Sequence, residues 1–144
     1  MYRNILVPTD GSDITSKAVQ TAITLAKTLG ARLTTISVKE PFPYSAISEM
    51  QPVPPQEFYD AQERIAAARV KSVVDAAALE GLSCSGHTVE ALHPWEAITD
   101  HAKSQDCDLI VMASHGRRGV SALLLGSETQ KVLTHSAVPI LIVK

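Results

Sequence analysis

The richest group of chemically capable residues follows an apolar run near position 110. It comprises ASHGRRG at 113–119 and GSET at 126–129. Glycines let backbone N–H groups approach phosphate oxygens, and a helix that starts at Gly126 would add unpaired N–H groups and a favourable dipole. The pattern therefore predicts a phosphate-binding loop. The alternative is a flexible loop that ends in an ordinary serine cap, because two glycines and a cap are common by chance.

A second polar group stands directly after the first apolar run, residues 5–7. It contains Thr9, Asp10 and Ser12. If the run is a strand, a carboxylate and two hydroxyls emerge at the carboxyl edge of a sheet, where they could meet a ligand or a metal ion. The alternative is a tight turn at Asp10 with Ser12 or Asp13 as the cap of the next helix.

The elements that must position these residues alternate along the chain. Short apolar runs that contain β-branched residues are typical of buried parallel strands. Helical spacing ends at Gly30 and Gly81, and Pro94 indicates the first position of a third helix. The alternation predicts a single-domain, doubly wound α/β sheet with helices on both faces. The expected strands are 5–7, 33–38, 84–92, 109–112 and 140–143, and the expected helices contain 19–26, 66–77 and 94–102, with a short fourth from 126.

Composition narrows the class of protein. The 144 residues suit one domain, and a net charge of -2 gives no field that attracts a polyanion, so we expect no nucleic-acid partner. No apolar run reaches the roughly 20 residues that cross a bilayer, and the N-terminus does not resemble a signal peptide. We therefore expect a cytoplasmic protein without membrane contact.

Metal and thiol chemistry have little support in the sequence. Cys84 and Cys107 lack CxxC spacing, and the five histidines lack HxxxH or HxH spacing. Cys107 lies between two aspartates, which would raise the pKa of its thiol. We expect neither a zinc site nor a reactive cysteine.

A proline-rich segment separates the second strand from the second helix. Residues 41–55 contain five prolines. They predict an irregular connection, which is either a solvated connector or a cover for a pocket or a partner.

Together these motifs resemble the universal stress protein family. The resemblance rests on ILVPTDGS at 5–12, SHGRRG at 114–119, LLGS at 124–127 and VPILIV at 138–143, and it covers essentially the whole chain. It implies the strand order 3-2-1-4-5 and a homodimer joined through the last strand. It also implies ATP or AMP binding in one branch of the family, whereas the other branch binds no nucleotide.

The nucleotide-binding branch carries Gly, two residues, Gly, nine residues, and then Gly followed by Ser or Thr. This chain matches at Gly116, Gly126 and Ser127 but has Ala113 in the first position. If position 113 required a positive φ or touched phosphate, the methyl group would cost about 1 kcal/mol or more, whereas at negative φ it costs little. Glu128 stands where the family often has an apolar residue, and a carboxylate beside phosphates repels them unless a metal or an arginine intervenes.

Carried over position by position, the resemblance implies two sets of contacts. One set frames adenine and ribose, and the other meets the phosphates; the metal is left open, with Mg²⁺ as the candidate. The first set is Pro8, Thr9, Asp10 and Val38 with Met112 and Ala113 beside them, and the second is His115, Gly116, Arg117, Gly126, Ser127 and Thr129.

The resulting hypothesis is a stress-response regulator whose adenine-nucleotide-binding domain spans residues 1–144. An ATP-using enzyme would need a Walker A loop or a comparable signature, which the chain lacks, so we expect hydrolysis to be absent or at most slow. A phosphoacceptor domain would need an aspartate after the third strand, where the chain has Glu90-Ala91-Leu92. The remaining alternative is a dimeric interaction protein of the same family that binds no nucleotide.

Overall fold

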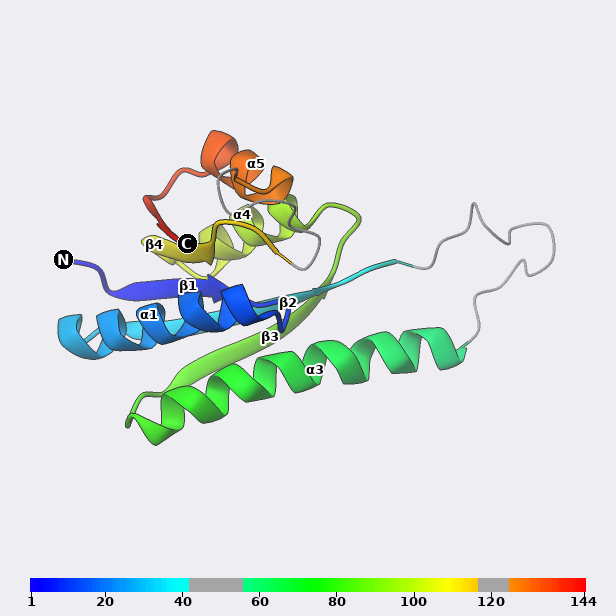
Figure 1. Ribbon diagram of the computed structural model, residues 1–144, viewed down its shortest axis with the longest axis horizontal. Coiled ribbons are helices and arrows are strands. Elements are labelled where there is room, and N and C mark those ends of the chain that lie inside the picture. The colour runs from blue at the N-terminus through cyan, green and yellow to red at the C-terminus, as the bar shows by residue number, and fades with distance from the viewer. Residues whose placement is uncertain (42–55, 117–124) are drawn as a thin grey trace.

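The computed structural model describes residues 1–41, 56–116 and 125–144 (Figure 1). Within these residues, five parallel strands form one sheet in the order β3-β2-β1-β4-β5. This confirms the predicted fold class and strand order. The strands are β1 (Asn4–Pro8), β2 (Arg32–Lys39), β3 (Cys84–Glu90), β4 (Leu109–Ala113) and β5 (Ile140–Val143).

The helices cover both faces of the sheet, as predicted (Figure 1). On one face lie α1 (Asp13–Leu29) and α3 (Gln56–Leu79), and on the other lie α4 (Pro94–Ser104) and α5 (Ser127–His135). Apart from Pro41, the proline-rich segment 41–55 is outside the described residues, so its role stays a prediction.

The central strands are buried on both faces, which explains their continuous apolar sequences. In β1, Ile5 and Val7 pack in the core beneath α1, while Leu6 packs in the core beneath α4, and all three side chains are 0% exposed. Alternate residues of one strand therefore fill two separate cores.

The start of α1 settles one open alternative. Ser12 is the N-cap, and its side chain accepts a hydrogen bond from the N–H of Thr15. Gly11, just before it, has a φ of 76°, a left-handed conformation that glycine adopts without strain. Ser12 rather than Asp13 therefore caps the helix.

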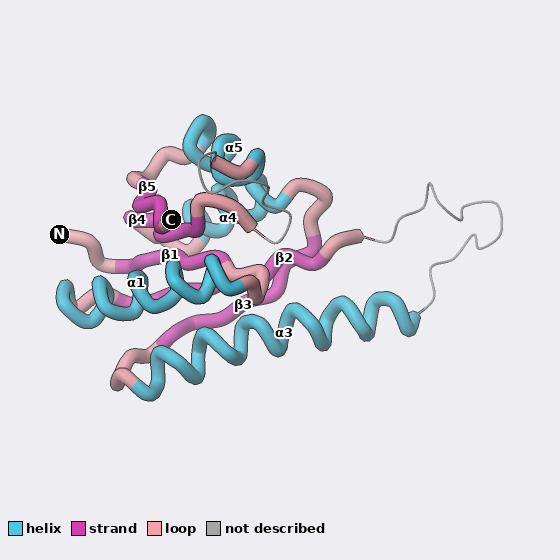
Figure 2. The backbone as a smooth tube through the Cα atoms, viewed as in Figure 1, coloured by secondary structure: helices cyan, strands magenta, loops and turns pink. Residues whose placement is uncertain are grey.

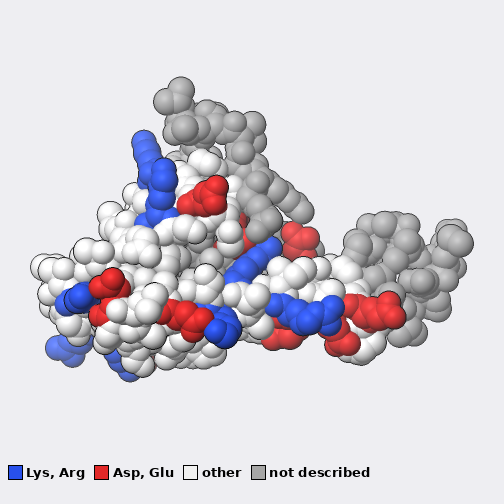
Figure 3. All heavy atoms as spheres, turned by 60° about the horizontal axis from the view of Figure 1, so that its bottom comes forward, with Lys and Arg blue, Asp and Glu red and all other residues white. Residues whose placement is uncertain are grey.

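Charged side chains of both signs alternate along the face that carries α3 (Figure 3). Some of them form ion pairs between elements, such as Lys27 with Glu80 at 3.1 Å and Lys39 with Glu63 at 2.7 Å. This face therefore mixes charges rather than presenting one sign. None of the described helices is long and apolar enough to cross a membrane.

Candidate functional site

Two loops meet at the carboxyl edge of the sheet. They follow β1 and β4, which are paired neighbours in parallel orientation, so both leave the sheet on the same side (Figure 2). A Cβ atom placed on Gly116 would lie 2.7 Å from Oδ2 of Asp10. At such a distance a real Cβ atom would force the carboxylate to shift, so glycine allows the loop after β4 to approach Asp10 in its present position.

The Asp10 carboxylate has a defined orientation. Its Oδ1 atom accepts hydrogen bonds from the N–H of Ser12 at 2.9 Å and from the hydroxyl of Thr15 at 2.8 Å, while Oδ2 lies toward Gly116. The turn-and-cap alternative and the ligand alternative are therefore compatible. One carboxylate oxygen stabilises the turn into α1, and the other lies at the meeting point of the two loops.

The start of α5 is held against the end of β4. The N–H of Gly126 donates to the carbonyl of Ser114 at 2.7 Å, and the hydroxyl of Thr129 donates to the carbonyl of Ala113 at 3.1 Å. A Cβ atom on Gly126 would lie 3.1 Å from the Cα atom of His115. The N–H of Ser114 in turn donates to the carbonyl of Val143 at 2.8 Å, at the end of β5. A helix N-terminus, which favours anions, therefore lies beside the loop that carries Gly116.

The structure brings most of the expected residues to this edge. Thr129, expected to contact phosphate, is buried, and its hydroxyl donates to the carbonyl of Ala113, so its contact with phosphate stays a prediction. Arg117 lies outside the described residues. Pro8, Thr9 and Asp10 end or follow β1, Val38 is half-buried near the end of β2, Met112 and Ala113 are buried at the end of β4, and His115, Gly116, Gly126 and Ser127 lie in the following loop and at the start of α5.

Ala113 belongs to a strand, which rules out the cost expected for a positive φ. Among the described residues, the only non-glycine residue with a positive φ is Asp106. Ala113 therefore lies in the β region, where its methyl group causes no backbone strain.

Glu128, a carboxylate that was expected to repel phosphates, is bonded to a neighbouring helix. Its Oε2 atom accepts the N–H of Trp95 at 2.9 Å, in the first turn of α4. Within the described residues the N-cap of α4, His93, makes no side-chain capping bond, and Pro94 has no N–H. Glu128 thus caps a neighbouring helix, a contact worth about 0.5–2 kcal/mol. The sequence signal that could have indicated this contact is His93 at the start of α4, because histidine rarely caps a helix with its own side chain.

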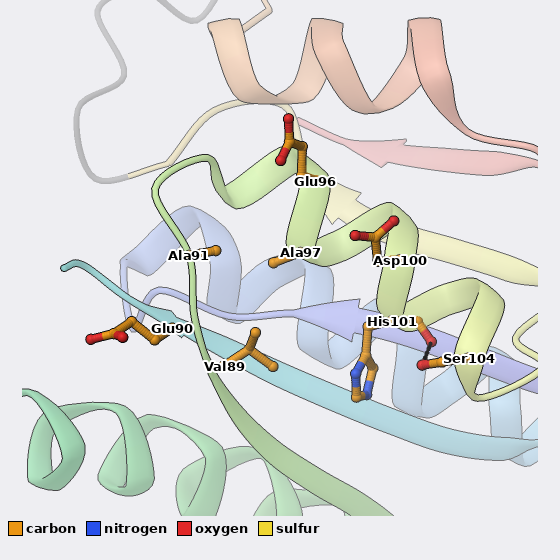
Figure 4. Close-up of a pocket in the computed structure, with 8 residues that line it drawn as sticks. All are labelled: Val89, Glu90, Ala91, Glu96, Ala97, Asp100, His101 and Ser104. Atoms are coloured by element: carbon orange, nitrogen blue, oxygen red, sulfur yellow. Dashed lines mark hydrogen bonds between the residues drawn. The ribbon is translucent and has the colours of Figure 1, made fainter.

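A separate hollow of about 300 Å³ lies between the end of β3 and α4. Figure 4 shows His101 pointing from α4 toward the strands, and its ring lies 4.8 Å from that of His87 in β3. Burial and the neighbouring His87 lower the pKa of His101. Within the described part of the chain, no group of three metal-ligating side chains forms. The hollow is lined by Val89, Glu90, Ala91, Glu96, Ala97, Asp100, His101 and Ser104.

Both cysteine thiols are poor nucleophiles. Burial raises the pKa of Cys84 to about 11. Burial is also the main cause of the raised pKa of Cys107, with Asp108 and Asp106 adding to it. The sequence identified the two aspartates, but the larger effect comes from the core around the sulfur.

Comparison with known proteins agrees with this architecture. The model of the universal stress protein family matches residues 1–144. A universal stress protein of Thermus aquaticus is 33% identical over 144 residues, which cover 100% of both chains. The solved structure of a universal stress protein from Lactobacillus plantarum has a TM-score of 0.83 at 25% identity, covering 99% of this chain and 98% of that one. A universal stress protein solved in complex with cAMP has a TM-score of 0.74 at 25% identity, covering 99% and 97%. With the whole chain matched in both sequence and fold, this protein belongs to the universal stress protein family.

Proposed function

We propose that residues 1–144 form an adenine-nucleotide-binding domain that acts as a stress-response regulator. The observation that carries the proposal is the approach of Gly116 to Asp10, with a would-be Cβ only 2.7 Å from Oδ2. At this edge of the sheet, a carboxylate, a backbone segment without a side chain and the N-terminus of α5 lie together. The similar protein solved with cAMP supports an adenine nucleotide as the ligand.

Each part of this edge suits one part of such a ligand. A carboxylate accepts hydrogen bonds from ribose hydroxyls, which suits Asp10. The backbone at Gly116 and the hydroxyl of Ser127 suit phosphate oxygens, because the dipole of α5 stabilises an anion there. The N–H of Gly126 already bonds to Ser114, so Gly126 serves this set by leaving room for a phosphate where a side chain would stand. Arg117 belongs to the phosphate set by its place in the sequence. ATP and AMP are the candidate ligands, with Mg²⁺ as the candidate metal for a triphosphate.

The proposed role is binding rather than rapid turnover. The sequence has no Walker A lysine and no other loop signature of an ATP-using enzyme. We therefore propose that hydrolysis is slow or absent, in a cytoplasmic regulator whose output depends on which nucleotide it holds.

The proposed assembly is a homodimer joined through β5. This strand lies at the edge of the sheet, and Leu141 within it is 40% exposed. An edge strand offers N–H and C=O groups to another chain, and two copies related by a two-fold axis would satisfy both edges at once. The second candidate function is that of a dimeric interaction protein that binds no nucleotide. The exposed edge at β5 supports this candidate equally well.

Titration calorimetry with ATP, AMP and adenosine tests the nucleotide proposal. The native protein should bind, and Gly126→Val should bind about tenfold more weakly or worse, because its side chain would crowd His115 where phosphate must approach. Gly81→Ala is the control for a glycine substitution away from these loops, since Gly81 lies after α3; unlike Gly126, whose φ is -63°, it has a left-handed φ of 76°. The proposal is wrong if the native protein binds none of the three, or if Gly126→Val binds them as tightly as the native protein.

A further inference from the structure

Glu128 joins the starts of two helices. It follows Gly126 and Ser127 in the first turn of α5, yet its Oε2 atom accepts the N–H of Trp95 in α4 at 2.9 Å. Since Pro94 has no N–H to offer, Trp95 provides the first backbone donor of α4. The carboxylate lies at the positive end of the α4 dipole, which favours its charge.

The first turn of α5 is therefore held from two sides. On the sheet side, Gly126 and Thr129 donate to carbonyls of β4 and of the residue that follows it. On the helix side, Glu128 bonds to α4, while at the far end of α5 the ring of His135 stacks on that of Trp95 with centroids 4.3 Å apart. The contacts to β4 fix where α5 begins, and the contacts to α4 fix the rotation of α5 about its own axis.

We propose that Glu128 is a positioning residue for the nucleotide site, holding the N-terminus of α5 in place through the backbone N–H of Trp95. This rests on the proposed function for its effect on ligand binding. The same contact keeps a carboxylate bound to α4 that would otherwise be free to lie near the phosphates. Glu128 therefore supports phosphate binding although its charge alone would oppose it.

Two substitutions separate position from charge. Glu128→Gln removes the charge and keeps an oxygen that can accept the N–H of Trp95, whereas Glu128→Ala removes both. If Glu128 positions α5, Glu128→Ala should weaken ATP binding about fivefold and leave adenosine unchanged, while Glu128→Gln should bind ATP at least as well as the native protein. If its charge only repels phosphate, both variants should bind ATP more tightly, and the proposal is wrong.

Calorimetry with ATP and adenosine provides the first measurement. Glu96→Ala is the matched control, because it removes an exposed carboxylate from the first turn of α4 and leaves the bond between Glu128 and Trp95 in place. Circular dichroism checks that every variant is folded. ATP binding by Glu128→Ala that equals that of the native protein would overturn the proposal.

Hydrogen exchange provides a second measurement that needs no ligand. Amides of residues 130–133, which include the first intrahelical bond of α5 from Gln130 to Gly126, should exchange about fivefold faster in Glu128→Ala than in Glu128→Gln or the native protein. Trp95 is the only tryptophan in the chain, so its fluorescence should also change in Glu128→Ala alone. If the native protein binds no nucleotide, the proposed function fails, and the exchange rates still decide whether Glu128 holds α5. Equal exchange rates in all three proteins would overturn that positioning role.

Discussion

Glycines serve opposite purposes in the two halves of the sheet. In the half with β2 and β3, a Cβ atom on Gly86 would collide with Cγ1 of Val70, so Gly86 lets α3 pack closely on β3. In the half with β4 and β5, Gly116 and Gly126 instead approach a carboxylate and the backbone of a loop. The first half uses glycine to bring apolar surfaces together, and the second uses it to bring polar groups to an open edge. A glycine in a sequence therefore gains its meaning from what lies opposite it.

The largest expected effects come from making the same substitution in both halves. Gly116→Ala should weaken nucleotide binding about tenfold or more, because the new Cβ atom displaces the Asp10 carboxylate, while the stability changes little. Gly86→Ala should do the reverse, lowering the free energy of unfolding by about 1–3 kcal/mol and leaving affinity unchanged. Calorimetry and urea denaturation of both variants measure the two effects. The comparison fails if both variants lose affinity and stability in the same proportion.

The next prediction contrasts the two edge strands. Leu141→Asp in β5 should convert the proposed dimer to a monomer, because it places a charge on an exposed apolar position of that edge. Ser85→Asp in β3 provides the control, since this exposed residue lies on the opposite edge and should leave the dimer intact. Light scattering at micromolar concentration measures both masses. A native protein that is already monomeric, or a folded Leu141→Asp variant that stays dimeric, would rule out β5 as the interface.

A smaller effect concerns the pH dependence of the free energy of unfolding, and it arises in the half of the sheet with β3. The pKa of His101 is lowered in the folded protein by burial and by His87, so the unfolded chain takes up the proton first as the pH falls. The resulting stability is fully present above about pH 6.5, the unfolded value, and is lost as the pH falls toward the folded value. Urea denaturation at pH 7.5 and 5.5 should show a loss that His101→Gln reduces. His93→Gln, at an exposed position, should leave the loss unchanged.

The smallest effect is expected at Ala113. Because this residue already has a strand conformation, Ala113→Gly relieves no backbone strain and should change ATP affinity by less than about threefold. It should cost about 0.5–1 kcal/mol of stability, as glycine does inside a strand. Calorimetry with ATP and adenosine checks the first expectation. A large gain for ATP alone would mean that the methyl group obstructs phosphate.

Sequence patterns predicted what depends on neighbours along the chain. Buried strands, a helix N-cap at Ser12 or Asp13 and the helix end at Gly30 all depend on local chemistry, the structure chose Ser12, and the strand order came from the resemblance. The orientation of Glu128 could not be predicted, because it depends on where α4 begins in space. The pairing of His87 with His101 depends in the same way on how α4 crosses β3.

The backbone of Ser114 connects the proposed dimer edge at β5 with the start of α5. Its N–H donates a hydrogen bond to the carbonyl of Val143, the last residue of β5. Its carbonyl accepts a hydrogen bond from the N–H of Gly126, the residue directly before α5. If nucleotide and a second copy bind where proposed, one residue separates the two events. Any influence between them must then be mutual, so that dimerisation raises or lowers nucleotide affinity by the same factor by which nucleotide raises or lowers the dimerisation constant. Measuring the dimerisation constant with and without ATP would give that factor, and it would provide a route from metabolite level to assembly.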